Sequence, residues 1–334
     1  MGVARAPESR FDVAQLAGIS QPLLVALIAA LAALVVFVAL PGRPLILHVV
    51  QKLGHPGVFA LIALSVLALR RRRATAELTP WRDYLIAFAS CVLLGAATEI
   101  AQSYTHRDPA VRDVGLDARG ALCALALAAA FDRRLRPRRR AGLARGACLA
   151  LSAGTAGLIL APLAWSVAAY VHRAYEFPVL FYPGSALDLY FVQPANSWVP
   201  LHLKAAAGAP PAAAPGLLVP LVGEPYAGVE LAEPSADWRG YRSLLIDVTN
   251  PGPQLLALQV RVDDRGASRA FADRYNGEFQ IAAGERSVVR IPLQSIAGAP
   301  SDRKLDLSAI ARIILFRSGP DGPPALLLHR VTLE

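Results

Sequence analysis

The sequence predicts a multi-domain protein: an α-helical membrane bundle with five spans, followed by an all-β jelly-roll sandwich. Two observations lead to this fold class. Hydrophobic residues make up 54% of the 334 residues, above the roughly 45–50% of an ordinary globular domain, and the long apolar runs all lie before residue 172. After residue 225 the pattern changes to short alternating runs separated by Gly and Pro, which is typical of strands and turns.

The membrane part is expected to cross the bilayer five times, because a span needs roughly 20 apolar residues. Residues 1–21 are interpreted as a cytoplasmic leader and residues 22–171 as the helical domain. We interpret the first run as a retained anchor, since its apolar stretch of 19 residues exceeds the ~7–15 residues usual in a signal peptide. The expected spans are 22–40, 53–69, 84–101, 115–131 and 149–171.

Arginines predict the orientation of these spans. The loops 70–83 and 132–148 are rich in arginine, whereas the loops 41–52 and 102–114 hold few basic residues. Because positively charged loops stay in the cytoplasm, we place the two arginine-rich loops and the N-terminus there. Everything after Val171 then lies outside, as expected for a multi-pass protein of the cytoplasmic (inner) membrane.

The charge distribution agrees with this division. Residues 1–171 contain 19 Lys and Arg against 9 Asp and Glu, a net charge of +10, and residues 172–334 contain 15 against 16, a net charge of −1. The basic character therefore belongs to the membrane part, and no nucleic-acid partner is expected. The three cysteines lie in or beside the spans, so the outer part has no disulfide framework, and no metal or cofactor motif is found.

Six polar residues gather at the outer ends of three spans. Members of each pair are three or four residues apart and so share one helix face, and ionisable residues inside a membrane indicate a functional site. Phe59 and Gly120 continue two of these faces, and a small residue at Gly120 would let two helices approach closely. The pairs are Lys52 and His55, Glu99 and Gln102, and Asp113 and Asp117.

Two interpretations of this group remain open. In the first, a partly desolvated Glu99 serves as a general base or proton carrier with His55 as its acid–base partner. Lys52 and Arg107 would then hold a phosphate. In the second, the residues are interfacial side chains or structural ion pairs between helices. The further residues assigned to substrate binding in the first interpretation are Gln102, Asp113 and Asp117.

The three spans share a spaced pattern: Lys52-x-x-His55-x-x-x-Phe59, Glu99-x-x-Gln102, and then Arg107, Asp113, Asp117 and Gly120. Over about residues 22–131 this pattern resembles the VanZ-like membrane family. The fourth-helix pattern of that family usually has Asn at the position of Asp117, and often an acidic residue at the position of Ala110. The resemblance implies a role in the bacterial cell envelope and an effect on sensitivity to glycopeptide antibiotics such as teicoplanin, without supplying a reaction.

The chain after Val171 is divided into two parts. Residues 172–225 are an aromatic and Pro-rich segment with an Ala/Pro linker at 205–220, which we assign to the outer domain, and residues 226–334 form a β-sandwich domain. Apolar and polar residues alternate along several short runs, as expected for half-buried strands. The expected strands are 244–248, 256–262, 277–282, 286–293, 311–317 and 325–333.

Short motifs in the outer domain are Trp238-Arg239-Gly240-Tyr241, Asp273-Arg274-Tyr275-Asn276 and Arg303-x-Leu305-Asp306-Leu307. Over about residues 176–334 these resemble the galactose-binding-like jelly rolls that often serve as carbohydrate-binding modules. Aromatic rings can stack on sugars while Arg and Asn bind hydroxyls; the alternative is that these side chains pack in the core or brace turns. The glycan-binding candidates are Trp198, Trp238, Tyr241, Arg274, Tyr275 and Asn276.

Two classes of function follow. The first is a non-catalytic membrane protein, in contact with membrane lipid, that binds an envelope polysaccharide or a lipid-linked precursor. The second is a membrane enzyme that acts on a lipid-linked phosphorylated precursor through Glu99 and His55. The first is slightly favoured, because no nucleophile, metal site or cofactor fingerprint is found in the sequence.

Overall fold

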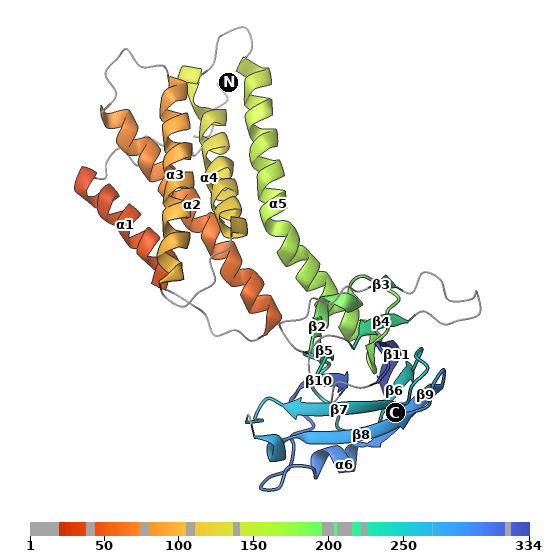
Figure 1. Ribbon diagram of the computed structural model, residues 1–334. Helices are drawn as coiled ribbons and strands as arrows, with labels where there is room; N and C mark the ends of the chain where they lie inside the picture. Colours follow the sequence, from red (N-terminus) through yellow and green to blue (C-terminus); the bar gives the residue numbers. More distant parts are fainter. Residues whose placement is uncertain are drawn as a thin grey trace, which may run out of the picture. The chain divides into compact units, whose positions relative to one another are not determined.

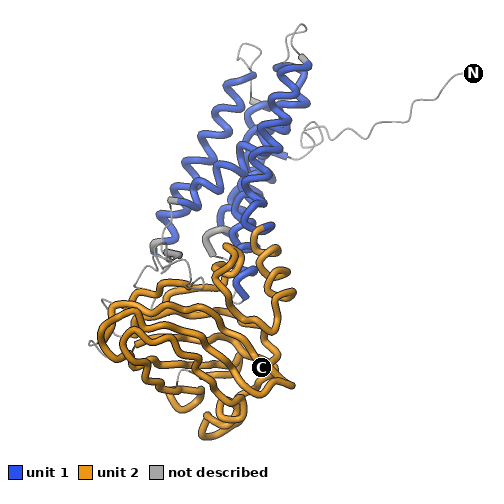
Figure 2. Tube along the Cα trace, turned by 90° about the vertical axis from the view of Figure 1, so that its right-hand side faces the viewer, with its two compact units in different colours: residues 1–164 blue, residues 165–334 orange. Residues whose placement is uncertain are grey.

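The computed structural model describes residues 20–37, 44–73, 80–104, 111–135, 141–195, 204–205, 216–221, 226–268, 270–317 and 322–334. The chain divides into two compact units, Met1–Ala164 and Trp165–Glu334 (Figure 2). The first unit is helical and the second is mainly β-structure (Figure 1).

The helical unit contains α1 (Gln21–Phe37), α2 (Leu45–Arg73), α3 (Pro80–Ser103), α4 (Val111–Phe131) and the first part of α5 (Ala141–Glu176) (Figure 1). Helix α2 packs on α3 and α4, and α1 packs on α2 and α3. The side chains buried between them are mostly apolar or small, as close packing of membrane helices requires. They include Phe59, Ile62, Leu67, Cys91, Ala121 and Leu125.

Among the residues that the structure describes, four helices are long and apolar enough to cross a membrane: Leu45–Arg72, Pro80–Gln102, Arg112–Phe131 and Gly142–Glu176. The first expected span corresponds to α1, which is described as a shorter apolar helix, and residues 38–40 lie outside the described residues. The structure therefore confirms four of the five expected spans. Helix α2 begins at Leu45, eight residues before the expected span, so Lys52 lies inside the helix and not at its end.

The second unit is a sandwich of two antiparallel sheets. Sheet A has the strand order β3-β4-β11-β6-β9, with β1 also paired to β11, and sheet B has the order β2-β5-β10-β7-β8. The strands are β1 (Val179–Phe181), β2 (Val192–Pro194), β3 (Lys204–Ala205), β4 (Leu217–Pro220), β5 (Gly228–Ala232), β6 (Ser243–Thr249), β7 (Leu256–Asp264), β8 (Tyr275–Ile281), β9 (Arg286–Pro292), β10 (Ile310–Arg317) and β11 (Ala325–Leu333). The short helix α6 (Leu293–Ala297) follows β9.

The chain passes repeatedly between the two sheets, since β6, β9 and β11 belong to sheet A and β7, β8 and β10 to sheet B. The six strands expected after residue 225 are confirmed to within two residues as β6 to β11. The linker assigned to 205–220 is wrong at its end, because Leu217–Pro220 forms β4 and pairs with β11. Leu217 and Val219 point into the core, and four residues are too few for their alternation to stand out beside an Ala/Pro stretch.

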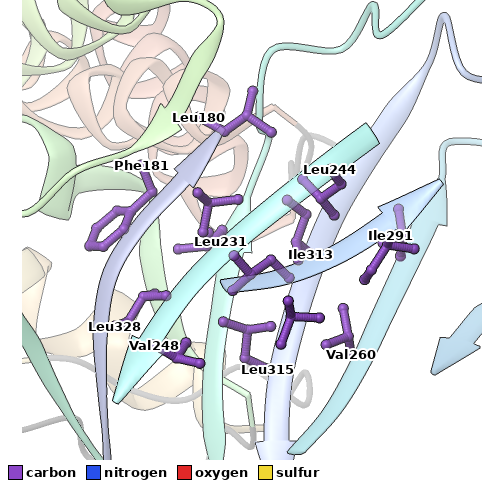
Figure 3. Packing of buried hydrophobic residues seen from close by; sticks show 14 of the residues in the cluster. Leu180, Phe181, Leu231, Leu244, Val248, Val260, Ile291, Ile313, Leu315 and Leu328 are labelled. Carbon is purple, nitrogen blue, oxygen red and sulfur yellow. The ribbon is translucent and has the colours of Figure 1, made fainter. Parts of the chain in front are cut away.

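The core of the sandwich lies between the inner faces of the two sheets. Figure 3 shows side chains from sheet A, such as Leu244 and Ile291, lying against side chains from sheet B, such as Ile313 and Leu315. Along most of β6 the buried residues alternate with partly exposed ones, which is the pattern of a sheet with one covered face; in β10 the outward-facing Ile314 is buried as well.

The last turns of α5, from Trp165 onward, belong to the same unit as the sandwich. The Tyr170 hydroxyl donates to the carboxylate of Glu233, and the Arg173 guanidinium donates to the Glu233 backbone carbonyl. Arg173 also lies over the ring of Phe191, with 3.8 Å from its guanidinium carbon to the ring centroid. Cation–π and hydrogen-bond contacts therefore join this helix end to the segments flanking β2 and β5.

Candidate functional site

Helices α2 and α4 bring a histidine and an aspartate together inside the helical unit. Nδ1 of His55 lies 3.3 Å from Oδ1 of Asp117. Asp117 has none of its surface exposed, and the side chain of His55 is 15% exposed. A carboxylate removed from water in this way needs a partner, because an unpaired buried charge is costly. His55 is that partner among the described residues.

Two glycines make this close approach geometrically feasible. A Cβ atom on Gly120 of α4 would lie 2.5 Å from the Cα and 2.6 Å from the carbonyl carbon of Pro56 on α2, far inside van der Waals contact. A Cβ atom on Gly95 of α3 would lie 3.1 Å from Oδ2 of Asp117. The close helix approach predicted at Gly120 is confirmed, and it places His55, which precedes Pro56, beside the α4 face that carries Asp117.

Helix α3 contributes the third group of polar residues. Glu99 and Gln102 are buried, with 5% and 4% of their surfaces exposed. Glu99 follows Gly95 by one helical turn, so it lies on the side of α3 that faces Asp117. The charges of Asp117, Asp113 and Glu99 all act on the imidazole of His55. The group formed by His55, Glu99, Asp113 and Asp117, which we call the polar cluster, thus combines side chains from three helices.

The remaining expected residues of this site are placed differently. Lys52 lies on the same helix as His55 but its side chain is exposed, and Arg107 lies outside the described residues. An imidazole beside several carboxylates can accept, hold and release a proton, and a neighbouring carboxylate can orient it. The arrangement therefore suits proton transfer or the binding of a cationic or hydroxyl group.

A second polar group at the other end of α2 was not predicted. Arg71 of α2 donates to the hydroxyl of Tyr84 at 2.7 Å and forms an ion pair with Asp132 after α4. The Tyr84 hydroxyl in turn donates to Asp132 at 3.1 Å. Arg71 was assigned to a cytoplasmic loop because of its charge, but α2 continues to Arg73. The mutual satisfaction of all three side chains indicates a structural clamp between helix ends.

Most of the aromatic glycan candidates in the sandwich pack on its core. Trp238 has no exposed surface, and its indole N–H donates to the Ser235 carbonyl at 2.7 Å, so Trp238 as a residue that stacks on sugar is corrected to a core residue. Tyr241 and Tyr275 are partly buried and pack against the core cluster. Burial also raises the pKa of Tyr275. Trp198 lies outside the described residues.

The two polar candidates lie on the outer face of sheet B. Asn276 of β8 is paired with Arg261 of β7, and its amide donates to the Phe271 carbonyl at 3.0 Å. Arg274, which directly precedes β8, lies over the ring of Phe271 with 5.7 Å between the guanidinium carbon and the ring centroid. The adjacent Asp273 does not pair with Arg274; the Ser268 N–H and the Arg303 guanidinium hold the pKa of Asp273 at about 2.

The same outer face carries charged residues that sequence reasoning missed. Arg261 donates to both oxygens of Asp263, at 2.8 and 2.6 Å, and Arg312 of β10 donates to Asp263 at 2.5 Å. Burial alone would raise the pKa of Asp263, but the two guanidiniums outweigh it and hold that pKa below its usual value. Residue parity could have found Arg261, since it stands between the core residues Val260 and Val262 and must face outward.

Among the described residues, no group of three or more His, Cys, Asp and Glu side chains could hold a metal ion. The described cysteines Cys91, Cys123 and Cys148 are all free thiols.

Comparisons with known proteins add similarities of shape for the β-structured part. No protein-family model matches the sequence, and no curated protein matches it. The chain is similar to an exo-β-agarase structure, at 16% identity and a TM-score of 0.37, over 47% of this chain and 24% of that one, so it spans about a quarter of the agarase's length. It is also similar to the family 11 carbohydrate-binding module of Clostridium thermocellum (15% identity, TM-score 0.31, 42% of this chain and 81% of that one).

A third similar structure is a carbohydrate-binding module specific for non-crystalline cellulose, of family 28, at 13% identity and a TM-score of 0.34, over 47% of this chain and 93% of that one. The assignment of the second unit to the β-sandwich class rests on its own strand pairing. Apolar helices long enough to span a membrane and a two-sheet sandwich thus define the class of this protein.

Proposed function

We propose that this protein is an integral membrane protein of the bacterial cell envelope that is VanZ-like in its helical part. In this proposal the sandwich binds an envelope glycan, and the polar cluster binds the polar group of a lipid-linked intermediate. The observation that carries the proposal is the contact of His55 with Asp117, together with the buried Glu99 whose charge acts on the same imidazole, within mainly apolar helices. Ionisable groups at such positions are costly and mark functional sites.

The pattern of spaced residues supports the VanZ-like part of the proposal. His55 and Asp117 belong to that pattern and lie in contact, and Gly120 of the same pattern lies against Pro56 of α2. Residues that are distant in sequence and share one cluster are what a binding site built from the pattern requires.

An enzyme is the second candidate function, and one specific contact favours it. The His55–Asp117 pair has the arrangement of a general acid–base histidine oriented by a carboxylate. With Glu99 as a second proton-transfer group, the cluster would act on a lipid-linked phosphorylated precursor. Lys52 and Arg107 would bind the phosphate in this scheme, as point charge and planar fork.

Substitutions in the polar cluster test the proposal. In cells whose sensitivity to teicoplanin depends on this protein, we expect Glu99→Gln and His55→Ala to abolish the effect without lowering the amount of membrane-inserted protein. The matched control is His48→Ala, which removes an exposed histidine of the same helix and should leave the effect unchanged. Loss of folded protein in both cluster variants would instead assign these residues to helix packing.

The membrane topology gives a separate prediction. We propose that the N-terminus is cytoplasmic and the sandwich extracytoplasmic, because the basic residues gather in the loops 70–83 and 132–148. A periplasm-dependent reporter such as alkaline phosphatase fused after Glu334 should therefore be active. The control is the same reporter fused within residues 136–140, where it should be inactive. An inactive reporter after Glu334 and an active one within residues 136–140 would place the sandwich in the cytoplasm.

A further inference from the structure

Arg274 on the outer face of sheet B has a hydrogen-bond donor, Nε, without an acceptor among the described residues. This Nε is buried. It forms no ion pair with a described carboxylate; its only described ring contact is with Phe271. A guanidinium remains charged at physiological pH, and buried polar groups are normally satisfied by a partner. The Arg274 side chain as a whole is partly exposed, so the rest of its guanidinium is open to an acceptor from outside the described chain.

The charges of two further arginines reach Arg274. Arg261, Asp263 and Arg312 all act on the guanidinium of Arg274, and we call Arg261, Arg274 and Arg312 the arginine cluster. Asp263 is shared by Arg261 and Arg312, and Arg312 lies 3.8 Å from Glu230. Three guanidiniums therefore face two carboxylates. The surplus positive charge lies at Arg274, which is repelled by the other two arginines.

We propose that the arginine cluster binds the acidic group of an anionic polysaccharide, with Arg274 as the principal contact. The inference rests on the proposed glycan-binding function of the sandwich and names its substrate class. A sugar carboxylate accepts two parallel N–H donors from a guanidinium. Arg261 and Arg312 remain 19% and 26% exposed, so their free N–H groups can reach the same ligand.

The neighbourhood of the cluster favours a polysaccharide over a lipid headgroup. Phe316 lies two residues beyond Ile314, and Arg312 two residues before it, on the outward side of β10. The cluster and the Phe316 ring are thus separated by about 13 Å along the strand. The exposed ring of Tyr226 packs on Phe316 with 5.7 Å between centroids, and Gln259 and Glu278 form a hydrogen-bonded pair nearby. Aromatic rings and amide groups beside a charged cluster suit a sugar chain that extends along the strand.

Paired ligands that differ only in charge test this inference. Full-length protein in nanodiscs of phosphatidylcholine is titrated with polygalacturonate, with its fully methyl-esterified form, with peptidoglycan and with phosphatidylglycerol vesicles. We expect binding of polygalacturonate and weaker binding of the ester. Arg274→Gln should weaken polygalacturonate binding about tenfold to a hundredfold, as for the loss of hydrogen bonds to a charged group, and Arg274→Lys should weaken it less.

The matched control is Arg290→Gln, which removes the same charge from the exposed surface of β9 in sheet A; it should leave binding unchanged. Melting temperatures of the three variants show whether each is folded. Equal binding of acid and ester, unaffected by Arg274→Gln, would overturn the anionic substrate and leave glycan binding standing. Binding of no polysaccharide would overturn both proposals, and binding of anionic vesicles alone would replace the glycan with a lipid surface.

Discussion

Replacing Gly120 with alanine is expected to destabilise the helical unit more than any other single-methyl change on α4. The added Cβ would lie 2.5 Å from the Cα of Pro56, so α2 and α4 must separate. Backbone is the obstacle here and no side-chain rotation can relieve the clash. Overpacking of this kind costs about 1–3 kcal/mol and sometimes more, which should lower the melting temperature of the purified protein by several degrees.

Gly57→Ala is the matched control for this prediction. Gly57 follows Pro56 on α2, is exposed, and has open space where a Cβ would stand. Its substitution should leave the melting temperature unchanged or raise it slightly, because alanine favours helix over glycine by up to about 1 kcal/mol. If Gly120→Ala and Gly57→Ala both have the melting temperature of the wild-type protein, the close contact of α2 with α4 is refuted.

Trp238→Ala is expected to produce the largest loss of stability in the sandwich. Trp238 is the largest fully buried side chain of the protein's described part, and its removal deletes both packing and the hydrogen bond to Ser235. A Trp-to-Ala change in a core costs about 3–5 kcal/mol. Hydrogen exchange measured by mass spectrometry should show faster exchange throughout β6 and β11, because we expect these inner strands of sheet A to open together with the core.

Leu255→Ala is the control, because Leu255 is 58% exposed in the segment before β7. The opening free energies derived from hydrogen exchange should stay within about 0.5 kcal/mol of the wild-type values. The pair of variants also distinguishes the two possible roles of Trp238, core packing and sugar stacking. Substitution of a residue that stacks on sugar would change glycan binding and leave hydrogen exchange unchanged. Unchanged exchange in Trp238→Ala would contradict its place in the core.

Hydrophobic periodicity predicted the strands that bury one face. Elements and residues whose positions depend on contacts with distant parts of the chain could not be predicted in this way. The alternation along Leu256–Asp264 was sufficient to place β7 and to show which side faces the core. Trp238 was assigned wrongly because it precedes a strand in a turn, where no alternation reports on burial. The short strand β4 was missed because its pairing partner, β11, is more than a hundred residues away in the sequence.

The candidate site shows the same division. Spacing predicted that Glu99 and Gln102 share one face of their helix, and both side chains are buried on α3. One of the two interpretations made Glu99 the acid–base partner of His55. In the structure the carboxylate of Asp117 lies 3.3 Å from the imidazole, and the charge of Glu99 also acts on it. Which residues of different helices meet depends on how far each helix is rotated and shifted along its neighbour, and the backbone contact between Gly120 and Pro56 sets that register.

The contacts of Tyr170 and Arg173 with Glu233 and Phe191 bear on how the sandwich can be isolated. A fragment that starts at residue 172 would lack Tyr170, so Glu233 and Phe191 would lose their contacts with that side chain. A fragment that starts at Trp165 would keep that edge complete but would also carry the exposed apolar side chains of Trp165, Val167 and Val171. The residues that complete the edge of this domain belong to the end of a hydrophobic helix. A soluble fragment therefore either lacks part of that edge or carries exposed apolar residues at its N-terminus.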